Sequence, residues 1–279
     1  MIVKLDGNLD DDDRPMHAMM VALKDIHATA TDRRWKLHCG ECQYVGPWAT
    51  AVLAAAYIEG VRRQQHPRLV LPEVPSALAA YCSFSGLRHL VRKEPTPKAD
   101  HPESETIPLE QFTQASWDRS NRIIALLRRH TELDSEREEQ IRSCVQEVTQ
   151  NIVDHADSPI GGVLSARYMS ASREVRVGIV DRGIGIARSL AREYPDTHNS
   201  MKALQRVTQG GFTSRSRPNN MGIGVSNLFL MVKSAGGRMA IFTGDAFAAL
   251  HGSAGSPVIQ SLGCDFPGTG VFFTLPTDA

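Results

Sequence analysis

The sequence lacks an excess of charge of either sign, because its 31 basic side chains balance 31 acidic ones over 279 residues. This balance argues against a nucleic-acid footprint or a membrane-surface patch, both of which need clustered basic residues. No apolar run approaches the length of a transmembrane helix, and the acidic N-terminus is not typical of a signal peptide. Cysteines number only five, an odd count that favours a reduced cytosol over a disulfide framework. We therefore expect a cytoplasmic α/β protein that binds neither nucleic acid nor membranes.

Two common nucleotide-binding motifs are also missing. No GxxxxGK[ST] occurs, which excludes a P-loop, and residues 222–227 depart from GxGxxG because residue 227 is Asn. The same segment does place Gly222 and Gly224 directly before residues 225–234, an apolar run that predicts a helix. Glycines that open a helix leave bare N–H groups at its positive end, which suits a phosphate. Each glycine on its own would also be explained by a simple turn.

A long amphipathic helix is predicted over residues 135–154, where apolar residues recur at helical spacing. This apolar stripe consists of Ile141, Val145, Val148 and Ile152. Beside the stripe, Glu147, Asn151 and His155 follow one another at four-residue steps and therefore share one helix face. A carboxylate, a carboxamide and an imidazole in one file can hold a hydrated metal ion and polarise a water. A solvated polar face would explain the same pattern, so the helix alone leaves both interpretations open.

The N-terminal third predicts a small α/β layer, because short β-rich segments alternate with helical ones. Strands are expected at residues 1–9, 35–39 and 69–71, and helices at 16–28, 48–63 and 76–84, followed by a closing segment at 86–91.

Two features of this layer could bind a metal, and each has a simpler explanation. The four aspartates at residues 10–13 stand before a proline, where acidic side chains favour a helix N-terminus. Cys39 and Cys42 form a CxxC beside His38, but zinc normally needs four ligands and no second pair has suitable spacing. A redox dithiol would place its first cysteine at a helix N-terminus, whereas the helix here is expected to begin near Trp48. We interpret the two cysteines as structural thiols.

The middle of the chain predicts a break between two parts. Residues 93–108 hold four prolines among charged side chains, so they cannot bury a core and predict a linker. Helices are expected next at 111–131 and 135–154, with Ser135 and Glu138 forming a capping box at the start of the second.

Two β-rich runs, at 162–169 and 174–180, follow the long helix and lead into the sequence DRGIGI, which begins at Asp181. An aspartate at the end of a strand can accept a hydrogen bond from an exocyclic amine. Gly183 and Gly185 let the backbone come close to a planar ring. These residues alone are compatible with an ordinary turn, and their meaning depends on the other motifs.

Five segments in one order resemble the GHKL superfamily, which includes histidine kinases, anti-sigma serine kinases, gyrase, mismatch-repair ATPases and heat-shock chaperones. EVTQNIVDHA resembles the N-box, DRGIGI the first glycine box and NNMGIGVSNL the second. GGFTSR resembles the segment that leads through the ATP lid, and PGTGVFFTLP resembles the closing Gly-Thr strand. The spacing Glu-x3-Asn-x3-His is most similar to the anti-sigma kinase branch.

The resemblance implies that the ligands are ATP and Mg²⁺, and it assigns a role to several residues. Asn151 would ligate the Mg²⁺ that bridges the triphosphate oxygens, and Glu147 would be the catalytic general base. Asp181 would recognise the adenine amino group, with Thr269 supporting it through water. The other ATP-binding residues that the resemblance implies are His155, Gly183, Gly185, Thr213, Gly222, Ile223 and Gly224.

Residues 1–92 resemble the STAS fold of anti-sigma-factor antagonists in the order of their strands and helices. In that family a Ser or Thr before the first long helix is phosphorylated as a switch. Here residues 45–48 read VGPW and no hydroxyl occurs before Thr50, so we expect the switch to be absent. The predicted fold is therefore a STAS-like α/β domain at 1–92, a Pro-rich linker at 93–108, and a GHKL (Bergerat) α/β sandwich at 109–279.

Three classes of function fit these residues. The first is a Mg-dependent ATPase whose nucleotide state regulates a protein partner or self-association. The second is an anti-sigma-type protein serine/threonine kinase, and the third is a nucleotide-gated binding module with negligible turnover. An intact Glu147 argues against the third, but the same base serves water and hydroxyl alike, so the first two stay open. A histidine autokinase is disfavoured because His130, near the end of its predicted helix, is typical of a C-terminal cap.

Overall fold

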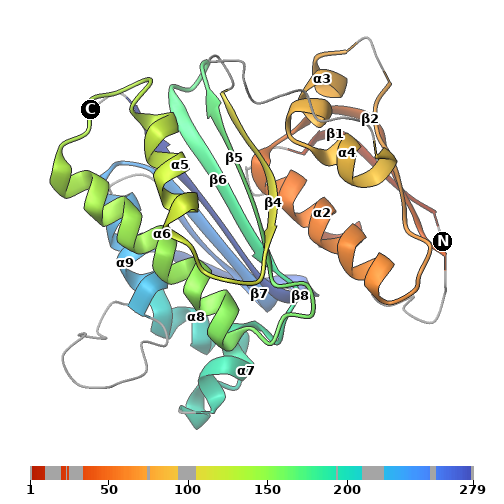
Figure 1. Cartoon of the computed structure of the whole chain (residues 1–279). Coiled ribbons are helices and arrows are strands. Elements are labelled where there is room, and N and C mark those ends of the chain that lie inside the picture. The colour runs from red at the N-terminus through yellow and green to blue at the C-terminus, as the bar shows by residue number, and fades with distance from the viewer. Residues whose placement is uncertain are drawn as a thin grey trace.

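The computed structural model describes residues 2–9, 20–22, 24, 34–73, 76–93, 105–192, 194–208, 223–251 and 256–277. Within these ranges the chain forms a three-stranded and a five-stranded sheet, with helices packed between and around them (Figure 1). The α/β class expected from the sequence is confirmed. None of the described helices is long and apolar enough to cross a membrane.

The smaller sheet is parallel and lies in the N-terminal part, as the alternation of strands and helices predicted. Its strands, in spatial order, are β1 (Ile2–Leu9), β2 (Lys36–Val45) and β3 (Arg68–Val70). The described helices of this part are α2 (Pro47–Arg62), α3 (Ala77–Phe84) and α4 (Leu87–Arg92). The aspartates at 10–13 lie outside the described residues.

Helix α2 is apolar on nearly every side, which is typical of a helix buried between two layers. Twelve of its 16 residues are buried, and Pro47 occupies the first turn, where its missing N–H removes no hydrogen bond. Trp48 is fully buried and packs against β6 (Glu174–Asp181) of the larger sheet at Gly178. A Cβ atom at Gly178 would lie 2.5 Å from the Cα of Trp48, so only glycine permits this close approach. The N-terminal layer and the larger sheet therefore share one hydrophobic core.

The larger sheet is antiparallel throughout, in the order β4-β5-β6-β8-β7. The strands other than β6 are β4 (Thr106–Phe112), β5 (Gly162–Met169), β7 (Arg238–His251) and β8 (Val258–Pro276). The two strands expected after the long helix are thus confirmed. Helices cover the face of this sheet that lies opposite α2 (Figure 1). They are α5 (Trp117–Leu127), α6 (Ser135–His155), α7 (Gly185–Ala191), α8 (Ser200–Thr208) and α9 (Ile223–Ser234).

Strand β4 corrects the prediction for residues 106–116. It begins inside the stretch expected to be a linker, and it contains Gln111, where a helix was expected to start; α5 begins only at Trp117. Pairing with β5 decides the conformation, because Phe112 packs directly over Gly162 and the Gln111 side chain donates a hydrogen bond to the Ile160 carbonyl (2.8 Å). These are nonlocal contacts, which outweigh the local helical preference.

The long helix α6 is confirmed, with its apolar stripe buried, but its cap differs from the prediction. Asp134 is the N-cap, and its Oδ1 accepts a hydrogen bond from the Arg137 N–H at 2.7 Å. Ser135 is the first helical residue. Glu138 does not close a capping box but accepts a hydrogen bond from Arg128 at 2.7 Å. Aspartate caps a helix as well as serine does, so the pattern allowed either start.

Candidate functional site

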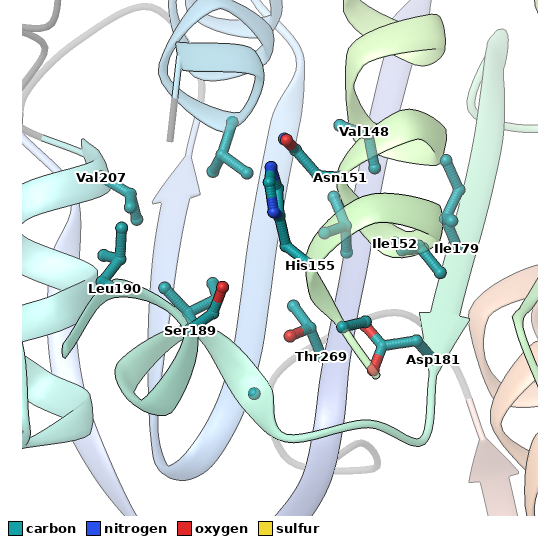
Figure 2. Close-up of a pocket in the computed structure, with 15 residues that line it drawn as sticks. Val148, Asn151, Ile152, His155, Ile179, Asp181, Ser189, Leu190, Val207 and Thr269 are labelled. Atoms are coloured by element: carbon teal, nitrogen blue, oxygen red, sulfur yellow. The ribbon is translucent and has the colours of Figure 1, made fainter. Parts of the chain in front are cut away.

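A pocket lies where the end of α6, the start of α7 and strands β6 and β8 meet (Figure 2). Five of the residues predicted for the site line it, and most of the other lining side chains are apolar. The five are Asn151, His155, Asp181, Gly185 and Thr269. The apolar lining includes Val148, Ile152, Ile179, Ile186, Leu190 and Val207. Apolar walls with a few convergent polar groups are typical of a small-molecule site.

Helix α6 supplies two polar side chains, Asn151 and His155, which both point into the pocket (Figure 2). They stand one turn apart beside the buried Val148 and Ile152, so packing of the apolar stripe fixes the direction in which they project. Within the described residues neither side chain makes a hydrogen bond to the protein. The amide oxygen of Asn151 is therefore available to a ligand.

Asp181 ends β6 and is only 1% exposed. Its Oδ1 accepts a hydrogen bond from the Gly183 N–H at 2.7 Å. Burial raises the pKa of this carboxyl from 3.8 to about 7, although hydrogen bonds from Gly183 and Thr269 act in the opposite direction. Thr269 contributes both its backbone N–H and its hydroxyl to Asp181. A buried carboxyl with this pKa, facing an apolar pocket, can accept a hydrogen bond from a neutral donor.

The turn that follows β6 requires glycine, because its backbone packs too closely against the end of α6 to leave room for a side chain. The Ile184 N–H donates to the Ala156 carbonyl (2.8 Å), and a Cβ at Gly183 would lie 1.8 Å from that oxygen. Gly268, on β8, has a φ of +91°, and a Cβ there would lie 2.4 Å from the Asp181 carbonyl oxygen. The two glycines thus let β8 and α6 close around Asp181.

Thr243 on β7 is a site residue that the sequence did not reveal. Its Oγ1 donates to the Gly268 carbonyl (3.1 Å) and accepts from the Ile186 N–H (2.9 Å). Thr243 is 1% exposed and lies in no recognisable motif. Ser189 was missed as well, although it follows Gly185 by one helical turn and lines the pocket. Thr243 joins the start of α7 to β8 and so holds two walls of the pocket together.

Glu147 lies outside this pocket, although it shares a helix with Asn151 and His155. It borders a neighbouring groove between α6 and α9, where the Asn227 side-chain amide donates to its Oε2 at 3.3 Å. Burial raises the pKa of Glu147, while the hydrogen bond from Asn227 lowers it. A carboxylate with a raised pKa accepts a proton more readily near neutral pH.

The second glycine box is described only in part. Thr213 and Gly222 lie outside the described residues, whereas Ile223 and Gly224 open α9. Val225, in the first turn of α9, lines the pocket. The positive end of this 12-residue helix therefore borders the pocket beside α6, as expected for a phosphate site.

The protein itself offers few ligands for a metal ion. Among the described residues, no group of three or more His, Cys, Asp or Glu side chains could hold one. Cys39 and Cys42 are both buried, and their role as structural thiols stays an interpretation. A cation in the pocket would take an oxygen from Asn151 and its other ligands from a bound anion or water, which suits Mg²⁺ carried by phosphates.

Comparison with known proteins gives a family for part of the chain. Residues 113–229 match the family model of the histidine kinase-like ATPase domain. A solved structure with some likeness is the B-subunit of the DNA gyrase from Myxococcus xanthus, with 14% sequence identity and a TM-score of 0.25. The match covers 41% of this chain and 30% of that one. No curated protein matches, and no match identifies the N-terminal parallel sheet as a STAS fold.

The family match and the pocket agree in position. The matched residues include α6, β6, α7 and the start of α9, and each of these elements contributes residues to the pocket lining. Residues 113–229 are thus similar to the histidine kinase-like ATPase domain, and a domain of this kind implies ATP binding.

Proposed function

We propose that this protein is a Mg²⁺-dependent ATPase of the cytoplasm whose nucleotide state regulates a protein partner or its own self-association. The observation that carries the proposal is the arrangement of polar groups in the pocket. A buried carboxyl, Asp181, and a carboxamide without a hydrogen-bond partner among the described residues, Asn151, border the same apolar cavity from different elements (Figure 2).

Adenine fits the end of the pocket at Asp181. The exocyclic amine of adenine donates a hydrogen bond, and the Asp181 carboxylate is a buried acceptor with Thr269 beside it. Ile179 and Ile186 offer apolar surface to the faces of the ring. The Gly183 N–H binds Oδ1 and so holds the orientation of the carboxylate toward the proposed base.

The triphosphate fits the end near α9. Its charge would lie at the N-terminus of that helix, where the first N–H groups of a helix have no intrahelical partners and where Gly222 and Gly224 stand in the sequence. Asn151 would offer its amide oxygen to Mg²⁺, which neutralises phosphate charge when bound. His155 stands between Asn151 and the base end and would contact ribose or phosphate. Thr213 and Ile223 complete the proposed set of ATP-binding residues.

Glu147 is the proposed general base. It takes a proton from the attacking water, and its half-buried position and raised pKa suit that task. Asn227 orients its carboxylate from α9. Since α9 also carries the proposed phosphate-binding turn, the base and the phosphates are held by neighbouring turns of one helix.

An anti-sigma-type protein serine/threonine kinase is the alternative, supported by the spacing Glu-x3-Asn-x3-His. In that case Glu147 takes its proton from a protein hydroxyl instead of water. Incubation with γ-labelled ATP, with and without cell extract, separates the classes: released phosphate identifies an ATPase and labelled protein a kinase. ATP binding without either product identifies a nucleotide-gated binding module and refutes the proposed chemistry.

Glu147→Gln gives the sharpest test of the base, because it keeps the shape of the side chain and the contact with Asn227. Turnover should fall by about 10²–10⁴-fold while ATP affinity stays within a factor of a few. Glu139→Gln is the matched control, since Glu139 lies on the same helix and lines the same groove two turns earlier. Unchanged turnover in Glu147→Gln would exclude Glu147 as the base.

A further inference from the structure

A buried ion pair joins the N-terminal layer to the proposed adenine site. Glu59 on α2 accepts a hydrogen bond from the Nε of Arg182 at 2.6 Å, and Nη2 lies 2.6 Å from the same oxygen. The two side chains are only 5% and 4% exposed. Arg182 directly follows Asp181 in the chain, so this pair reaches the turn that presents the proposed adenine acceptor.

The turn after Asp181 has two further anchors, both from the end of α6. The Arg182 N–H donates to Ser158 Oγ (3.2 Å), and the Ile184 N–H donates to the Ala156 carbonyl (2.8 Å). These two bonds hold the backbone and do not restrain the Arg182 side chain. The direction of that side chain is fixed by Glu59.

Helix α2 is a rigid support for Glu59. Its first turn is seated on the larger sheet, where Trp48 packs against glycines in two adjacent strands, Gly178 in β6 and Gly270 in β8. Close backbone approach at these glycines leaves α2 little freedom to slide. Glu59 lies three turns further along the same helix and therefore has a defined position relative to β6.

Removing Glu59 would leave a buried cation without compensation. Burial lowers the pKa of Arg182 and the charge of Glu59 opposes this effect, while Arg182 Nη1 has no hydrogen-bond partner among the described residues. Asp181 is the other carboxylate whose charge acts on Arg182. Without Glu59 the buried Arg182 cation loses its ion-pair partner, and the turn that carries Asp181 and Arg182 has to shift to hydrate it.

We infer that Glu59 is a positioning residue of the nucleotide site: by binding Arg182 it holds the turn that carries Asp181, so that the Asp181 carboxylate is oriented for the adenine amino group. This inference rests on the proposed role of Asp181 in binding adenine. It makes the N-terminal layer a functional part of the ATP site, although Glu59 does not touch the pocket.

The test compares two nucleotides in the full-length protein. ATP carries the 6-amino group, and purine riboside 5′-triphosphate lacks it but has the same sugar and phosphates. The ratio of their dissociation constants measures recognition of the amino group alone. Glu59→Gln should lower this preference for ATP by roughly 2- to 30-fold, the range for coupling through a contact one residue away. A variant that is only partly folded would bind both nucleotides less and leave the ratio unchanged.

Arg63→Gln is the matched control. Arg63 also pairs with Glu59, through Oε1 at 2.8 Å, but it is 44% exposed and does not reach the Asp181 turn. Its removal should leave the ratio unchanged. If Glu59→Gln does not give folded protein, Glu59→Asp replaces it, because it keeps the charge and shortens the reach by one methylene.

The measured ratios of the two dissociation constants distinguish three cases. A lower ratio in the Glu59 variant, with an unchanged ratio in Arg63→Gln, supports the positioning role. An unchanged ratio in a folded Glu59 variant overturns it, while the proposed function stands. A parent protein that does not prefer ATP over the purine analogue overturns the adenine role of Asp181 and the inference with it.

Discussion

If Asp181 accepts the adenine amine as proposed, its raised pKa should make ATP affinity depend on pH. With a pKa of about 7, the carboxyl is mostly ionised at pH 8 and mostly protonated at pH 6. The adenine amine donates a hydrogen bond, and it binds a carboxylate more strongly than a carboxylic acid. ATP affinity should therefore rise as the pH is raised through 7.

The size of the effect follows from the titration. Roughly nine-tenths of the Asp181 carboxyl is ionised one pH unit above its pKa and about one-tenth is ionised one unit below it, so affinity should change by up to about ninefold between pH 6 and pH 8. This corresponds to about 1.3 kcal/mol. Hydrogen bonding to the protonated carboxyl would reduce the change, so ninefold is an upper bound.

Isothermal titration calorimetry at a series of pH values measures this dependence. The phosphates of ATP titrate in the same range, so purine riboside 5′-triphosphate serves as the reference, and only the difference between the two nucleotides reports Asp181. Asp181→Asn should remove that difference. Parallel pH profiles for the two nucleotides in the parent protein would refute the reasoning, because Asp181 would then not be the acceptor of the amino group.

Three further predictions concern stability. Burial raises the pKa of Asp181 from 3.8 to about 7, which corresponds to about 4 kcal/mol of unfolding free energy. This contribution is fully present below pH 4 and is lost as the pH rises through 7. Urea unfolding at pH 8 should therefore find Asp181→Asn more stable than the parent protein. Gly178→Ala should destabilise by about 1–3 kcal/mol, since its Cβ would overlap Trp48; an unchanged urea midpoint would contradict the close approach of α2. Thr243→Val should also cost about 1–3 kcal/mol, because the Ile186 N–H loses its acceptor, and it should weaken ATP binding; calorimetry that finds full affinity would show that Thr243 does not shape the pocket.

Local patterns were enough to predict the elements that build the site. The apolar stripe of α6, the strands predicted at 162–169 and 174–180, and the helix predicted at 225–234 all follow from hydrophobic periodicity and glycine positions, within two residues of the observed bounds. Asp181 was predicted because it ends a buried strand before a glycine-rich turn. These features depend on residues within about ten positions of each other.

Nonlocal pairing explains what the sequence did not reveal. Strand β4 was expected to be part linker and part helix, because its partner β5 begins 50 residues after Phe112. Thr243 contributes to the pocket through contacts across 57 and 25 residues. The pair of Glu59 and Arg182 spans 123 residues and two layers of the fold. No periodicity in the sequence marks such contacts.

The separation of Glu147 from the pocket has a geometric cause. Residues at four-residue steps drift by roughly 40° per step around a helix, so Glu147 and His155 differ by roughly 80°. Helix α9 packs against α6, and Asn227 of α9 donates a hydrogen bond to Glu147 on the side of α6 that faces away from the pocket. One row of polar residues on α6 therefore borders both the pocket and the groove between α6 and α9. The helix that carries these three residues was predicted correctly, but the separation of Glu147 from the pocket depends on where α9 packs against α6.

The position of α2 bears on how the proposed ATPase would transmit its nucleotide state through the fold. Most of the pocket is built on one face of the larger sheet, while the N-terminal layer covers the opposite face through α2. A change at the pocket can reach that layer by two routes, through the sheet at Gly178 or around its edge through Arg182. The contact through the sheet is rigid, because the backbone of Gly178 packs directly against the backbone of Trp48. The contact at the edge of the sheet is an ion pair between the Arg182 and Glu59 side chains, which can break. Nucleotide-dependent changes in the N-terminal layer should therefore begin at Glu59 and spread along α2.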